Sequence, residues 1–170
     1  MKALARYLRY STCCLFVFAI AGCGTTAIID THPLIAQSPD SEIAKIYFLR
    51  TDPGFDGVGG NAFTISLGGE DLLTIAKGEY ALTYLKNYSG DVTVESSTVV
   101  YRGGLNTWIK VEESQHFNFE GPKTYYVTFS KIFNDTIMGT SYIAQSITED
   151  IAKRLARELK PVGDAMAHPL

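Results

Sequence analysis

Cysteine is scarce in this 170-residue chain, and its three cysteines, Cys13, Cys14 and Cys23, all lie near the beginning. The chain after Cys23 therefore has no thiol, which excludes a disulfide, a thiolate metal site and a cysteine nucleophile from that part. The apolar segment 13–22 has about ten residues, too few for a membrane-spanning helix of roughly 17–25. The sequence thus predicts a domain that depends on its own hydrophobic core.

Positive charge is also in short supply beyond the first residues. The 15 Lys and Arg residues include Lys2, Arg6 and Arg9, which leaves 15 − 3 = 12 basic residues against 18 acidic ones after residue 22. Nucleic-acid binding calls for a basic face, and no polybasic run that would suit anionic headgroups is present. The composition therefore argues against a nucleic-acid partner and favours a water-soluble body.

The N-terminus has the features of a secretory signal: a basic head, the apolar run 15–21 and small residues before a cut site. Its ending, Ile20-Ala21-Gly22-Cys23, resembles a bacterial lipobox. This resemblance implies that cleavage between Gly22 and Cys23 removes residues 1–22. It also implies that the Cys23 thiol carries a diacylglyceryl group and that the new N-terminus is acylated, for example with palmitate.

Such an anchor would be permanent, because each buried methylene gains about 0.8 kcal/mol and several acyl chains would be present. Enterobacterial lipoproteins that stay in the inner membrane tend to have Asp after the lipidated cysteine, whereas this chain has Gly24. The resemblance therefore predicts the periplasmic face of the outer membrane. Residues 23–41 are expected to be the lipidated N-terminus and a flexible tether that spans about 23 Å. The apolar pieces 27–29 and 33–35 could instead dock on the domain or on a partner.

From Ile43 onward the apolar residues mostly recur with a period of two, which is typical of β-strands. Segment 43–50 is apolar on both faces and predicts a central strand, and segment 61–67 places Phe63, Ile65 and Leu67 on one face. Gly68-Gly69 predicts a hairpin turn. Further strands are expected at 72–76, 79–86, 91–101, 107–113, around 117–119, at 124–130 and at 141–147, with a turn at 87–90. A change of apolar phase within 91–101 predicts a β-bulge near Ser96-Ser97.

The period changes to that of a helix after Thr148, a good capping residue. Ile151, Leu155 and Leu159 form an apolar stripe, so the helix is expected to cover an open end or face of a sheet and to stop before Pro161. Residues 161–170 are expected to be a loose tail. The predicted fold class is mainly β: an antiparallel β-sandwich at 42–160 that includes this short C-terminal α-helix.

Four segments carry a family resemblance: AKIYFLR, ISLGGEDLLTIAKGEYALTYL, EGPKTYYVTF and SYIAQSITEDIAKRL. Together they resemble the small bacterial lipoproteins catalogued as domain of unknown function 2846, over residues 44–159. The chain departs from the family at Ser89-Gly90, where the family has Pro-Gly. The resemblance implies a β-sandwich lipoprotein without an established activity, and it supplies no catalytic residues.

No pattern after Cys23 indicates catalysis, a metal or a cofactor. His32 lies in the expected tether, His168 in the expected tail, and His116 on the polar phase of a strand without an HxH or HExxH spacing. The loop 51–60 contains Asp52 and Asp56 but lacks the closing Glu of an EF-hand and the Lys-Ser/Thr of a phosphate loop. The serines have no Gly-x-Ser-x-Gly elbow and no evident histidine partner.

Aromatic residues are plentiful, with ten tyrosines, nine phenylalanines and one tryptophan. Trp108 is out of phase with its apolar neighbours Ile109 and Val111 and would be exposed, unless the helix or a loop covers it, which is the arrangement we favour. Trp108, Tyr84 and Tyr126 are the candidate residues for a surface binding site.

Three functions stay open at this point. The favoured one is a non-catalytic, lipid-anchored protein of the outer membrane that serves as a structural or accessory component of an envelope assembly, with protein partners. The second is a module that binds peptidoglycan or another glycan through exposed aromatic residues. The third is an enzyme whose site the sequence does not reveal.

Overall fold

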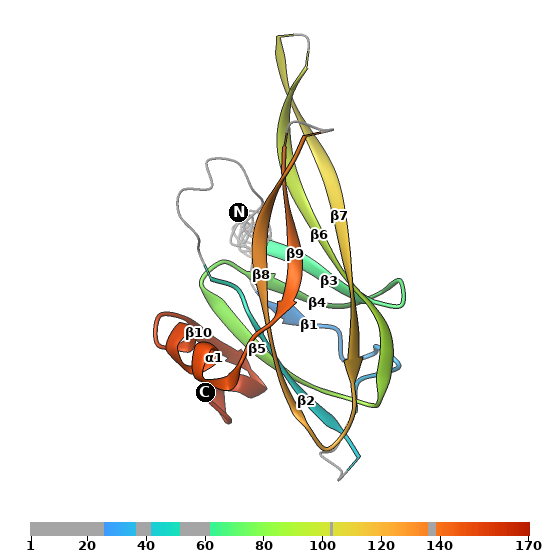
Figure 1. Ribbon diagram of the computed structural model, residues 1–170, viewed down its shortest axis with the longest axis vertical. Helices are drawn as coiled ribbons and strands as arrows, with labels where there is room; N and C mark the ends of the chain where they lie inside the picture. Colours follow the sequence, from blue (N-terminus) through green and yellow to red (C-terminus); the bar gives the residue numbers. More distant parts are fainter. Residues whose placement is uncertain (1–25, 37–41, 52–61, 103, 136–138) are drawn as a thin grey trace, which may run out of the picture.

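Two five-stranded sheets make up the domain in this computed structural model, which describes residues 26–36, 42–51, 62–102, 104–135 and 139–170 (Figure 1). The first sheet has the order β1-β4-β3-β6-β7 and consists of Ala27–Ile28, Glu70–Ala76, Ala62–Leu67, Tyr88–Arg102 and Leu105–Phe119. The second has the order β10-β5-β2-β8-β9 and consists of Lys160–Gly163, Glu79–Leu85, Ala44–Leu49, Thr124–Asn134 and Gly139–Ser146. The expected mainly β fold with two sheets is confirmed.

The first sheet is antiparallel throughout, but the second is mixed. Strand β2 pairs in parallel with β8, and β10 pairs in parallel with β5. The chain leaves the second sheet after β2 and re-enters it later, so β8 arrives beside β2 in the same direction. The expectation of antiparallel pairing therefore holds throughout the first sheet and, in the second, for β2 with β5 and for β8 with β9.

Strand β2 is central, as its apolar composition predicts, because both of its faces are buried. Ile46 and Phe48 face the core between the sheets, whereas Tyr47 and Leu49 face a second, smaller core on the outer side. The hairpin β3–β4 also follows the prediction: Phe63, Ile65 and Leu67 are buried. The turn glycines Gly68 and Gly69 adopt positive φ, which side chains with a Cβ disfavour.

The predicted bulge at Ser96-Ser97 is wrong, and so are the turn at 87–90 and the break between 113 and 117. The register of β6 and β7 is unbroken from Tyr88↔Phe119 to Arg102↔Leu105. Polar residues, Ser96 and Thr98, occupy buried inward positions there, so the apolar phase changes while the strand does not. A register shift occurs instead in β3, between Ile65 and Ser66.

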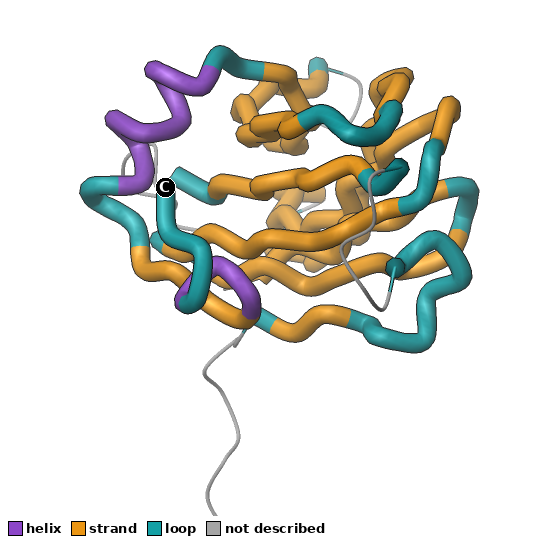
Figure 2. The backbone as a smooth tube through the Cα atoms, turned by 90° about the horizontal axis from the view of Figure 1, so that it is seen from below, coloured by secondary structure: helices purple, strands orange, loops and turns teal. Residues whose placement is uncertain are grey.

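Helix α1, Glu149–Ala156, lies on the outer face of the second sheet, as expected for a covering helix. It ends before Leu159, and Ala152 and Ala156 are the residues it buries most deeply. Lys153 and Glu149 form an i, i+4 ion pair of 2.6 Å. Figure 2 shows α1 and the short η1, Asp164–Met166, on one side of the sandwich.

The C-terminal segment 161–170 is not a loose tail. Its β10 pairs with β5, Ala165 is fully buried, and the Tyr47 hydroxyl donates a hydrogen bond of 2.9 Å to the carbonyl of His168. The edge of β5 offers backbone partners, and Pro161 and Val162 are partly buried there. These contacts tie the tail to the domain.

The N-terminal segment 26–36 docks on the domain, which decides between the two arrangements that the sequence left open. Strand β1 pairs with β4, and the backbone N–H of Ala36 donates to the carbonyl of Tyr84 at 2.8 Å. Ile28, Leu34 and Ile35 pack against the core between the sheets. Residues 26–36 therefore belong to the folded body rather than to a tether.

Candidate functional site

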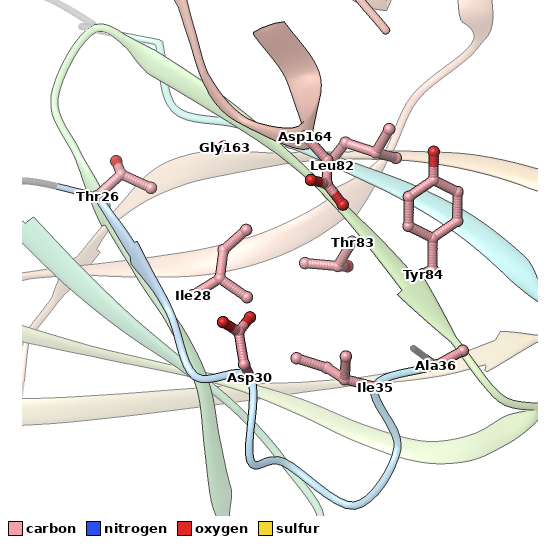
Figure 3. Close-up of a pocket in the computed structure, with 10 residues that line it drawn as sticks. All are labelled: Thr26, Ile28, Asp30, Ile35, Ala36, Leu82, Thr83, Tyr84, Gly163 and Asp164. Carbon is pink, nitrogen blue, oxygen red and sulfur yellow. The ribbon is translucent and has the colours of Figure 1, made fainter. Parts of the chain in front are cut away.

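A pocket of about 280 Å³ lies where the two terminal segments meet β5 (Figure 3). The N-terminal segment, β5 and the start of the C-terminal η1 each contribute to its wall. The lining residues are Thr26, Ile28, Asp30, Ile35, Ala36, Leu82, Thr83, Tyr84, Gly163 and Asp164. The pocket exists only because both terminal segments dock, so sequence reasoning that treated them as loose could not predict it.

The pocket wall combines apolar side chains such as Ile28 and Leu82 with polar groups, and one buried hydroxyl in it is unsatisfied. Thr83 is 3% exposed, and its Oγ1 has no hydrogen-bond partner among the described residues. Burial, and then the negative charge of Asp164, raise the pKa of the Tyr84 phenol. Ligand pockets usually have volumes of roughly 300–1,000 Å³, so this one suits a small polar group or ordered water.

Tyrosines cluster on the outer face of the second sheet. Tyr47 stacks on Tyr126 with ring centroids 5.7 Å apart. Burial raises the pKa of Tyr47, and the neighbouring Tyr84, Tyr126 and Tyr80 raise it further. The structure thus brings the candidate residues Tyr84 and Tyr126 to one face, on either side of Tyr47, where both are half-buried.

Trp108 lies elsewhere, on the β6–β7 hairpin, which projects from one end of the molecule (Figure 1). It is 61% exposed, so the expected burial beneath the helix or a loop is wrong. Its phase places it on the outer face of the first sheet, opposite Val99, whereas α1 covers the other sheet. The three candidate aromatic residues therefore belong to two separate surfaces.

A serine, a histidine and an aspartate form a row across β6 and β7 that sequence reasoning missed. His116 Nε2 lies 3.5 Å from Ser89 Oγ, and His116 Nδ1 lies 3.2 Å from Asp91 Oδ1. The strand register places Asp91 opposite His116, and the sequence spacing of 25 residues gives no sign of this. The order of the three groups is that of a nucleophile, a base and an orienting carboxylate.

The surroundings of this row do not resemble an active site. The side chains of Asp91 and His116 are each 64% exposed, which confirms the expected polar position of His116. Hydrolases of this type hold the triad beside a pocket with preorganised oxyanion donors, whereas the pocket described above is lined by other residues. The row is a solvated set of cross-strand hydrogen bonds.

Metal and membrane features can be assessed for the described part of the chain. Within it, no group of three or more His, Cys, Asp or Glu residues is placed to hold a metal ion. No helix there is long and apolar enough to cross a membrane. His32, expected in a tether, is 5% exposed, and the candidate lipidation and cleavage residues Cys23 and Gly22 lie outside the described residues, as do Asp52 and Asp56.

Comparison with protein-family models, with curated proteins and with solved structures finds no match to this chain. The geometry and the sequence patterns are therefore the basis for assigning a function.

Proposed function

We propose that this chain is a non-catalytic lipoprotein that is anchored through Cys23 to the periplasmic face of the outer membrane, where it is a structural or accessory component of an envelope assembly. The observation that carries the proposal is the order of a basic head, a short apolar run and Ile20-Ala21-Gly22-Cys23. The two-sheet fold agrees with what the resemblance to domain of unknown function 2846 implies.

Docking of the N-terminal segment sets how far the domain sits from such an anchor. The Thr26 hydroxyl accepts a hydrogen bond of 2.9 Å from the amide of Ala76 and donates one to Glu79, so this residue is already docked on the folded body. Three residue steps separate Cys23 from Thr26, and an extended chain covers at most roughly 10 Å in three steps. The lipoprotein would therefore lie against the headgroups instead of about 23 Å above them.

The non-catalytic role is supported by the placement of the polar groups. The Ser89–His116–Asp91 row lies on an open sheet face, and the polar pocket beside β5 is small. A protein partner is favoured over nucleic acid, since the net charge does not suit nucleic acid.

Mass spectrometry of the protein purified from cell membranes tests the anchor. The expected N-terminal peptide begins at Cys23 and carries the masses of a diacylglyceryl group and an amide-linked acyl chain. The variant Cys23→Ser should remain unprocessed and mislocalised while it keeps the β-rich circular dichroism spectrum. An intact Met1 in the wild-type protein, or a free Cys23 thiol, would overturn the lipoprotein assignment.

Photo-crosslinking in cells tests the accessory role. A crosslinking amino acid at Lys45, an exposed position that pairs with Tyr84 and Thr124, samples the tyrosine-rich face. The same amino acid at Gln115, exposed on the first sheet, is the matched control. One envelope protein captured from Lys45 and not from Gln115 would support a defined assembly. Failure of both positions to capture a discrete partner would count against it.

The exposure of Trp108 favours a second candidate function, the binding of peptidoglycan or another glycan, because aromatic side chains can stack on sugar rings. Purified sacculi provide the test. Pelleting of the wild-type protein with sacculi, and loss of pelleting in Trp108→Ala, would establish glycan binding. Equal recovery of both proteins in the supernatant would exclude it.

A further inference from the structure

The outer half of the β6–β7 hairpin exposes two large apolar side chains. We call the described residues 98–102 and 104–111 the hairpin tip. Leu105 is 72% exposed and Trp108 is 61% exposed. The charge of Lys110 in this segment is balanced by an ion pair of 2.7 Å with Glu95 on β6. A Trp at the headgroup level with an aliphatic residue beside it is typical of protein segments that enter a membrane interface.

The strand register relates the hairpin tip to the N-terminal segment. Ala27, Thr74, Thr64 and Glu95 form one row across the first sheet. Because each neighbouring pair is antiparallel, β6 runs from Glu95 toward the tip in the sense opposite to β1. The chain that precedes Ala27 therefore leaves the row on the side toward which β6 extends.

The lengths of chain that extend from the two ends of this row allow the Cys23 anchor and the hairpin tip to reach one membrane surface. Strand β6 continues from Glu95 to Arg102, about 23 Å at roughly 3.3 Å per residue. The link from Ala27 back to Cys23 covers at most roughly 14 Å. Sheet twist of about 20–25° per strand turns β6 away from β1 by roughly 60–75° over three steps, which is less than a right angle. The tip and the anchor therefore leave the same half of the domain.

The size and chemistry of the hairpin tip favour a bilayer over a protein or a glycan. A Trp side chain buries about 150–250 Å², so the two exposed apolar side chains Trp108 and Leu105 supply only part of the roughly 800 Å² per partner of a stable protein interface. Tyr84 and Tyr126 lie on the other sheet and cannot add to the surface. The Glu95 carboxylate beside the hairpin tip already accepts a hydrogen bond of 2.7 Å from Lys110, which makes it less available to a sugar hydroxyl.

We infer that the hairpin tip is a second membrane contact, in which Trp108 and Leu105 enter the headgroup region of the bilayer that holds the Cys23 lipid. This inference rests on the proposed lipid anchor. It assigns to the projecting hairpin the role of fixing the orientation of the domain on the membrane, which a single anchor at the N-terminus cannot do.

Fluorescence of Trp108 tests the inference directly, because it is the only tryptophan of the chain. The full lipoprotein, purified from membranes, is reconstituted into vesicles of phosphatidylethanolamine and phosphatidylglycerol, with and without brominated acyl chains. The expected result is emission at short wavelength, strong quenching by the brominated lipid and weak quenching by acrylamide. Leu105→Asp should reverse all three, whereas Met166→Asp, at an apolar position that is 67% exposed in η1, should leave them unchanged.

Three outcomes would overturn the inference. Emission typical of water-exposed tryptophan in the vesicles would exclude membrane contact. Short-wavelength emission without quenching by the brominated lipid would mean that protein covers the tip. Identical spectra for Leu105→Asp and the wild-type protein would mean that the tip does not control the signal. The mass of the N-terminal peptide is measured on the same sample, so an unmodified Cys23 identifies failure of the anchor proposal separately.

Discussion

The two halves of the β6–β7 hairpin share one continuous register but differ in what surrounds them. In the half near the body, Val92, Val94, Phe117 and Phe119 are buried between the sheets. In the hairpin tip, the inward positions hold both Thr98 and Val100, which are buried, whereas Leu105 and Trp108 are exposed. A strand pattern alone therefore does not report burial, because cross-strand pairing can extend a hairpin beyond the core that it helps to form.

Strand β9 supports the hairpin in part through polar contacts. Strand β9 donates two hydrogen bonds to the hairpin, from the amide of Thr140 to Thr98 Oγ1 at 3.3 Å and from Ser141 Oγ to Glu113 Oε1 at 2.8 Å. Among the apolar side chains of this half, Leu105 and Trp108 are available on the surface, whereas Val100 is buried. The buried residues of the inner half therefore stabilise the fold, whereas the exposed residues of the outer half are available to bind.

The largest expected effect is the loss of an aromatic core residue in the inner half. Phe119→Ala should lower the free energy of unfolding by about 3–5 kcal/mol, since Phe119 is fully buried. Trp108→Ala, in the outer half, should change it by no more than about 0.5 kcal/mol. Urea unfolding followed by circular dichroism measures both. Similar losses for the two variants would show that the halves are not energetically distinct.

Loss of the hydrogen bond from Ser141 of β9 to Glu113 of the hairpin should have an intermediate effect on the free energy of unfolding. Ser141 is fully buried, so Ser141→Ala leaves a partly buried Glu113 carboxylate short of a donor and should cost about 1–3 kcal/mol. Ser130, which donates to Gln145 at 2.7 Å on the surface, is the matched control, and its Ala variant should cost less. Amide hydrogen exchange should accelerate between residues 96 and 113 in Ser141→Ala only. Unchanged amide protection between residues 96 and 113 would mean that this hydrogen bond does not stabilise the hairpin.

Tyr47, which lies in the covered body, should make stability fall at alkaline pH. The pKa of Tyr47 is raised in the folded state, mainly by burial. Above about pH 10 the unfolded chain releases the phenol proton first, so the folded state binds more protons and stability falls as pH rises. Tyr47→Phe removes this titration but also the hydrogen bond to His168.

Urea midpoints recorded from pH 8 to about pH 11 measure this effect. The wild-type midpoint should decline above about pH 10, and Tyr47→Phe should begin lower at pH 8 but decline less steeply. Parallel declines of the two proteins would show that Tyr47 does not contribute to the alkaline loss.

Local patterns in the sequence predict most of the strands, because burial on both faces of β2 and on one face of β3 fixes the order of apolar and polar residues along them. These patterns mislead where tertiary contacts bury polar residues or recruit segments with few apolar ones. Ser96 and Thr98 are buried although polar, which imitates a bulge. The segments 26–36 and 161–170 read as loose because their few apolar residues, such as Ile28 and Val162, acquire partners only when β4 and β5 are already in place.

The candidate site residues are harder to predict for the same reason. The phase of Trp108 gives its outward direction, but only the fold shows that nothing among the described residues covers it. Tyr126 lies beside Tyr47 through a parallel pairing of β2 and β8 that sequence separation does not reveal, and Tyr84 lies on the other side of Tyr47 through the pairing of β2 with β5. The polar pocket depends on both terminal segments at once.

The smallest expected effect concerns the outer face of the inner half, where Ser89, His116 and Asp91 form their row. An activated serine would react with a fluorophosphonate probe, and Ser89→Ala would abolish labelling. Because the row is solvated and the distance from Ser89 Oγ to His116 Nε2 is 3.5 Å, we expect no labelling of the wild-type protein above that of Ser89→Ala. Labelling that requires both Ser89 and His116 would instead make this face catalytic, and the functional difference between the two halves of the hairpin would then be reversed.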